Sequence, residues 1–185
     1  MWLWLQKLNV LMFCFLTSFL LLLAGWIEIT DMALISASTL NQEEEFKAIL
    51  NGSEVSPPVS TNLSGIAQLV LEKSEPLNLT YNVTITGIAN NHDSNVTSVH
   101  LHNGIRGYNG TEIKELKILP GYSENGIVAK GNLSASDSFS SELAGKGELA
   151  LNSLIQYIRN GEVYLDVHTQ DNPHSELRGQ IFPSP

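Results

Sequence analysis

The chain has 185 residues and carries 10 Lys and Arg against 19 Asp and Glu, a formal net charge of −9 at pH 7. This length allows one export segment and one domain, and the acidic balance repels phosphate backbones, which excludes a nucleic-acid partner. The only cysteine, Cys14, lies in an apolar N-terminal run. The rest of the chain therefore has no disulfide and must be held together by a hydrophobic core.

The N-terminus predicts an export segment over residues 1–30. Residues 8–29 are almost entirely apolar and long enough to span a bilayer, with Lys7 before them and Asp31 after them. The basic residue marks the inside, so the chain that follows lies outside the cell. Two interpretations stay open: a signal-anchor helix in the cell membrane, or a signal peptide cleaved after Ala37 that leaves a secreted protein. Residues 31–45 lack a hydrophobic period and end in an acidic cluster, which is typical of a tether.

Short runs with strand-like alternation follow along most of the remaining chain. In the clearest of them, Leu77, Leu79, Tyr81, Val83 and Ile85 alternate with Asn and Thr, the pattern of a strand with one buried and one solvated face. The expected strands are residues 46–50, 65–71, 77–86, 97–102, 113–118, 126–133, 163–168 and 176–182.

Residues 149–159 depart from this pattern. Leu151, Leu154, Ile155 and Ile158 fall on one helical stripe, and Gly161 supplies a C-terminal stop. We therefore predict that residues 46–185 form a mainly β domain, an antiparallel, Greek-key-like β-sandwich with one short helix, preceded by the N-terminal hydrophobic helix.

Three histidines lie in the expected strands in a pattern that suits a metal ion. His100 and His102 alternate with Val99 and Leu101, so both imidazoles point to one face, and His168 ends a later strand of the same character. Imidazole nitrogens are ligands for copper and zinc, and a site of three histidines leaves one position open for water or another ligand. The alternative is that the three rings hydrogen-bond within a polar network and bind nothing.

Two charged residues near these strands have a possible second role. Asp166 shares the face of His168 and could orient a metal-bound ring, as a backbone carbonyl also could. Arg178 is expected to pair with Glu176 on the last strand, with anion binding as the alternative. His174, beside a proline, is expected to be a solvated turn residue. The sequence contains no nucleophile elbow, phosphate loop or cysteine-pair zinc motif, so no residue pattern supports hydrolase activity.

The exported part is rich in N-glycosylation sequons of the form Asn-x-Ser/Thr. Chance would give fewer, so the pattern favours a glycoprotein, although a polar β-surface rich in Asn and Thr would also produce it. The sequons begin at Asn51, Asn62, Asn78, Asn82, Asn95, Asn109 and Asn132.

Several stretches resemble the CHRD domain, the module named from chordin. The opening from Phe46 to Val59 has the form F-x-A-x-L-x-G-x-E-V-x-P-P-V, and V-H-L-H-N-G at 99–104 and N-G at 109–110 follow in the family's order. Residues 154–169 and 173–181 complete the resemblance, which covers residues 46–182. It implies an extracellular or cell-surface module and does not imply an established activity.

The arrangement of His100, His102 and His168 is also similar to the copper ligands of copper/zinc superoxide dismutases. In that comparison Arg178 would correspond to an anion-guiding arginine. The zinc loop, the disulfide and a clear metal-bridging histidine are missing; His92 and His174 are poor substitutes. This second resemblance supports a sandwich and a mononuclear site more than it supports dismutase activity.

These observations lead to two hypotheses about function. The first is a non-catalytic, membrane-tethered CHRD domain that binds an extracellular ligand or protein at the cell surface, with one copper or zinc ion held by His100, His102 and His168. The alternative is a mononuclear copper enzyme of the superoxide-dismutase type that acts on a small oxidant.

Overall fold

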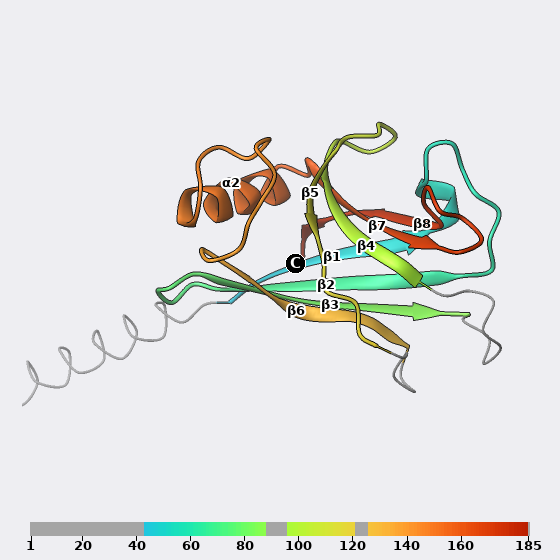
Figure 1. Cartoon of the computed structure of the whole chain (residues 1–185), viewed down its shortest axis with the longest axis horizontal. Helices are drawn as coiled ribbons and strands as arrows, with labels where there is room; N and C mark the ends of the chain where they lie inside the picture. The colour runs from blue at the N-terminus through green and yellow to red at the C-terminus, as the bar shows by residue number, and fades with distance from the viewer. Residues whose placement is uncertain (1–42, 88–95, 121–125, 185) are drawn as a thin grey trace, which may run out of the picture. The chain divides into compact units, whose positions relative to one another are not determined.

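The computed structural model describes residues 43–87, 96–120 and 126–184, which form antiparallel strands and one short α-helix (Figure 1). Along the chain the elements are β1 (Glu44–Asn51), the 3-10 turn η1 (Gly52–Glu54), β2 (Ser64–Glu72), β3 (Asn78–Thr86), β4 (Val96–Asn103), β5 (Thr111–Glu115), β6 (Ile127–Ser134), α2 (Glu148–Arg159), β7 (Val163–Thr169), β8 (Leu177–Gln180) and β9 (Phe182–Pro183).

The strands belong to one sheet that curls on itself. Its order is β5-β4-β7-β8-β1-β2-β3-β6, with β9 paired to β1 outside this path. The two ends of this order meet beyond β5, where Ile118 bridges to Ala129 of β6 and the Leu119 amide donates to the Val128 carbonyl at 2.8 Å. The half with β4 and β7 therefore faces the half with β2 and β3 (Figure 1).

The core fills the space between the two halves. Strict alternation in the sequence buries Phe46, Ala48 and Leu50 of β1 while the residues between them face outward. The same alternation in β4 buries Val99 and Leu101, which leaves the side chains on either side of them on the outer face. Because a one-residue slip would exchange the two faces, this apolar pattern fixes which polar side chains point outward together.

Helix α2 adds a second apolar layer to the core. Its buried residues are Ala150, Leu151, Leu154, Ile155 and Ile158, the predicted stripe with one further alanine. Its apolar face is covered because the helix contacts β6, β7 and β9.

The predicted fold class, an antiparallel β domain with one short helix, is confirmed. Two predicted strands are shorter in the structure. The strand expected at 113–118 ends at Glu115, and only Ile118 pairs again, with β6. The strand expected at 176–182 divides at Ile181, because β8 pairs with both β7 and β1 whereas β9 pairs with β1.

The predictions for the N-terminus lie largely outside the described residues. This applies to the hydrophobic helix and to most of the acidic tether, although Glu44 and Glu45 already belong to β1. Within the residues that the structure describes, α2 and η1 are the helical segments, and neither is long and apolar enough to cross a membrane.

Candidate metal centre

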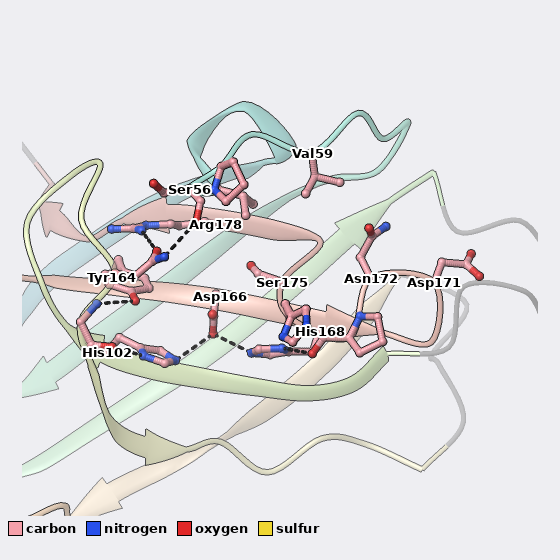
Figure 2. A pocket seen from close by; sticks show the side chains of 16 residues that line it. Ser56, Val59, His102, Tyr164, Asp166, His168, Asp171, Asn172, Ser175 and Arg178 are labelled. Carbon is pink, nitrogen blue, oxygen red and sulfur yellow. Dashed lines mark hydrogen bonds and ion pairs between the residues drawn. The ribbon is translucent and has the colours of Figure 1, made fainter.

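Strands β4 and β7 bring the predicted histidines together. They pair antiparallel, with His100 opposite Asp166 and Ser98 opposite His168. Because Val99, Leu101, Leu165 and Val167 fill the core, the residues between them project from the outer face of both strands. His100, His102, Asp166 and His168 therefore meet on one surface of a rigid two-strand unit. Figure 2 shows three of them, with Asp166 between His102 and His168.

These four residues form a group that could hold a metal ion. One ligand atom from each lies within 4.8 Å of the others. Asp166 Oδ1 is at the centre, 3.2 Å from His102 Nε2, 3.2 Å from His168 Nε2 and 3.9 Å from His100 Nδ1. His100 Nδ1 is also 3.1 Å from His168 Nε2. The cluster is shielded from water, since the Asp166 side chain is 8% exposed and the rings 13–16%.

Backbone carbonyls fix the orientation of two of the rings. His102 Nδ1 donates to the Gly110 carbonyl at 3.1 Å, and His168 Nδ1 donates to the Pro173 carbonyl at 2.8 Å. A carbonyl oxygen only accepts, so in each neutral ring the proton is on Nδ1 and the lone pair is on Nε2. Both Nε2 atoms then face the cluster, as in histidines that bind metals, whose other ring nitrogen usually donates to a carbonyl or carboxylate.

Two polar atoms at the centre of the cluster are buried without a hydrogen-bond partner among the described residues: His102 Nε2 and Asp166 Oδ1. They lie 3.2 Å apart. A neutral His102 would place a lone pair against a carboxylate oxygen, which is unfavourable unless a positive charge lies between them. A proton on the ring or a metal ion would supply that charge.

The pKa values of the cluster follow from its burial and from Asp166. Burial favours neutral imidazole, yet the Asp166 carboxylate outweighs it and raises the pKa of His102. The negative charge of Asp166, 3.2 Å from His168 Nε2, likewise raises the pKa of His168, whereas burial lowers the pKa of His100. Burial alone would raise the pKa of Asp166, but His102 and His168 hold it below its usual value.

An aromatic and a cationic side chain support His102 from the side. The Tyr164 ring stacks on the His102 ring, with centroids 4.9 Å apart and planes 9° apart. The Arg178 guanidinium lies over the Tyr164 ring at 3.5 Å from its centroid. The Tyr164 hydroxyl accepts from the Gly110 N–H at 3.1 Å, so the backbone of Gly110 contacts both Tyr164 and His102.

The expected pair of Arg178 and Glu176 does not form. Arg178 donates instead to the loop after β4, to the Ile105 carbonyl at 3.1 Å and the Tyr108 carbonyl at 2.8 Å. Glu176 accepts from Thr169 Oγ1 at 2.7 Å and from Asn172 Nδ2 at 2.6 Å. Residues two apart on a strand share a face, but here each side chain finds a nearer loop.

The remaining predicted residues lie apart from the cluster. His174 is an exposed loop residue, as expected, and lines the pocket beside the cluster. His92 and Asn95 lie outside the described residues. Sequence reasoning missed Tyr164 and Gly110; the alternation of β7 could have placed Tyr164 on the outer face, whereas nothing in the sequence locates the Gly110 carbonyl.

The described sequon asparagines fall into distinct environments. Asn78, Asn82 and Asn132 lie on neighbouring strands β3 and β6, and Asn132 Nδ2 donates to Asn78 Oδ1 at 3.1 Å. Asn62 is exposed. The Asn51 side chain caps η1 by accepting from the Glu54 amide.

The Asn109 amide joins two parts of the pocket that lies beside the cluster. Its Nδ2 donates to the Ser56 carbonyl at 2.9 Å, and its Oδ1 accepts from Arg178 at 3.2 Å.

Comparison with known proteins gives a consistent result. The family model described as "CHRD domain" matches residues 46–181, which confirms the resemblance seen in the sequence. Chordin of Xenopus laevis is 30% identical over 139 residues, which is 75% of this chain and 13% of the relative. Chordin of Danio rerio is 28% identical over 142 residues, 76% of this chain and 13% of the relative. The chain thus aligns with a small part of either relative, and no solved structure matches it.

Proposed function

Because the chain belongs to the CHRD domain family, we propose that residues 46–181 act as an exported module that binds an extracellular ligand or protein and is held in shape by one zinc or copper ion. The family supports a binding module. The metal ion is supported by the cluster on β4 and β7, whose rings are already oriented by backbone carbonyls.

The observation that carries the metal proposal is the pair of buried atoms without partners, His102 Nε2 and Asp166 Oδ1. An ion placed among the four ligand atoms would satisfy both and would balance the Asp166 charge. Asp166 would then bind the ion directly as a fourth ligand, whereas the sequence predicted only that it orients a metal-bound ring. Three imidazoles and one carboxylate are a donor set typical of zinc and acceptable to copper.

A fourth protein ligand also bears on the alternative function. Catalytic sites keep a position open for water or substrate, whereas four protein ligands close the tetrahedron, as in structural zinc sites. The closed arrangement therefore favours the binding module over the mononuclear copper enzyme. A copper-loaded protein that dismutes superoxide far faster than free copper, with the activity lost in His100→Ala, would reverse this preference.

The metal proposal predicts about one tightly bound ion per chain. Calorimetric titration of the EDTA-treated protein is expected to give this stoichiometry for Zn²⁺ and for Cu²⁺, with copper held more tightly because the affinity order of divalent metals places it above zinc. His100→Ala and His168→Ala should each abolish stoichiometric binding, since each removes one of the four ligand atoms.

The matched control for this titration is His174→Ala. It removes an exposed imidazole from a neighbouring loop and should leave binding unchanged. Absence of binding by the wild-type protein, or unchanged binding by His168→Ala, would contradict the proposed centre.

We also propose that the N-terminal segment exports the domain, either as a membrane anchor or as a cleaved signal, and that exposed sequons carry glycans. The support is the apolar run at 8–29 with Lys7 before it, together with the solvent exposure of Asn62. Protease added to intact cells should digest the domain. A domain protected from protease until the cells are lysed would contradict the export proposal.

A further inference from the structure

A pocket of about 680 Å³ opens beside the metal centre. Its floor includes Tyr164, Asp166 and Arg178, and two loops form its walls (Figure 2). The loop after η1 contributes apolar groups, among them Val55 and Val59. The loop between β7 and β8, residues 170–176, forms the other wall with further apolar and polar groups.

Arg178 is a buried cation in this pocket that has no partner of opposite charge. The residue is 2% exposed. Among the described residues, its hydrogen bonds go to neutral oxygens: the carbonyls of Ile105 and Tyr108 and the amide oxygen of Asn109. Among the residues that the structure describes, no carboxylate lies within ion-pair distance of it and its Nε has no hydrogen-bond partner.

The acidic groups around Arg178 are not paired with it. Glu54 forms an ion pair with Arg106 at 3.0 Å. Asp166 is opposite Arg178 in the pairing of β7 with β8, but its carboxylate faces the imidazoles of the cluster and would be neutralised further by a bound ion. Asp171 is an exposed residue of the pocket wall and forms no ion pair with Arg178. Arg178 is therefore a buried cation in the pocket with which no carboxylate of the described residues forms an ion pair.

A buried charge is costly unless it is paired, and a guanidinium is the side chain best suited to a carboxylate. The wall formed by the loop after η1 offers apolar surface to the same pocket through Val55, Pro57 and Val59. We propose that the pocket binds a carboxylate joined to a small apolar group, with the carboxylate at Arg178 and the apolar group against this wall. A free organic acid and the C-terminal residue of a protein both have this chemistry.

This inference rests on the proposed function only in that the domain is a binding module; it does not require the metal ion. The test uses N-acetyl-leucine and its amide, which share the apolar side chain and differ in the carboxylate. We expect saturable binding of the acid, at least about tenfold tighter than the amide, to both the EDTA-treated and the zinc-loaded protein, as an ion pair in a shielded site would give.

A third ligand distinguishes the two sources of the carboxylate. It is a short peptide with a C-terminal leucine. Binding of the peptide together with the acid identifies protein C-termini as the natural class, and binding of the acid alone identifies small organic acids. Equal affinity for acid and amide, or no binding of any of these ligands, would overturn the proposal.

Two substitutions of one wall residue test the role of charge without removing Arg178, whose loss could unfold the loop it holds. Val59 is partly exposed and accepts a change of similar size. Val59→Asp should weaken acid binding by about tenfold or more through repulsion, whereas Val59→Asn should have a much smaller effect. Equal losses in the two variants would also overturn the proposal.

The outcomes separate this inference from the metal centre. If zinc fails to bind while the acid binds, only the metal centre is wrong. If zinc binds while the acid does not, only the carboxylate pocket is wrong.

Discussion

Zinc at about a thousand times its dissociation constant is expected to raise the melting temperature of the domain by roughly 10 °C near pH 8, because binding only to the folded state adds about 4 kcal/mol. The unfolded chain cannot gather ligands from β4 and β7, whose histidines are 68 residues apart in sequence. The ion should therefore stabilise the native state almost exclusively.

This gain should shrink as the pH falls, because zinc competes with protons for the same nitrogens. The pKa values of His102 and His168 are raised in the metal-free domain. Their contribution to stability is complete below the ordinary histidine pKa of about 6.5 and is lost as the pH rises through the raised folded-state values. The lowered pKa of Asp166 adds to the stability of the folded domain at pH values above the ordinary carboxyl pKa. This contribution is lost only in acid.

The effect of pH on the stability that the cluster provides is therefore opposite with and without metal. The contribution of His102 and His168 to the stability of the EDTA-treated domain should decrease between about pH 6 and pH 8, while the stabilisation by zinc should increase over the same range. Thermal unfolding followed by circular dichroism, with zinc or with EDTA, measures both. His174→Ala should behave as wild type, and a zinc effect that is absent or independent of pH would contradict the account.

The second large effect is expected from Gly110→Ala. A Cβ at this position would overlap the carbonyl oxygen of Asn103, so the backbone must move. The Gly110 carbonyl accepts from His102 and the Gly110 N–H donates to Tyr164, and both contacts would be lost. We expect a loss of about 3 kcal/mol or more in the free energy of unfolding, together with a loss of stoichiometric zinc binding.

Gly107→Ala is the matched control in the same loop. Gly107 has a φ of +82°, but a Cβ there would meet nothing within 4 Å. Only the cost of the left-handed backbone conformation remains, about 1–2 kcal/mol, and zinc binding should persist. Denaturant unfolding and zinc titration of both variants provide the comparison. Wild-type behaviour of Gly110→Ala, or greater damage from Gly107→Ala, would show that the Gly110 carbonyl does not orient His102.

Alternation in the sequence predicted most of the fold. The stripe of Leu151, Leu154, Ile155 and Ile158 correctly predicted α2, and the alternation at 77–86 correctly predicted β3. What it could not supply is partner choice at the ends of strands. Residues 176–182 look like one strand, and only the packed sheet shows that β8 lies between β7 and β1, whereas β9, beyond Ile181, pairs with β1.

At the candidate site, too, the local sequence pattern predicted which face a residue occupies but not which strands lie side by side. Period-two alternation placed His100 and His102 on one face, and it marked His168 as a residue of similar character. The central position of Asp166 depends on the register between β4 and β7, which is set by long-range packing. The Arg178–Glu176 prediction failed for a related reason, because Arg178 donates to the loop after β4 and Glu176 accepts from Thr169 at the end of β7.

The central claim is that His100, His102, Asp166 and His168 bind one metal ion together, and anomalous diffraction from crystals of the zinc-loaded protein tests it most directly. We predict one peak at the zinc absorption edge, about 2.0–2.2 Å from His100 Nδ1, His102 Nε2, His168 Nε2 and Asp166 Oδ1. A peak bound elsewhere, or no peak between β4 and β7 at full zinc loading, would contradict the account.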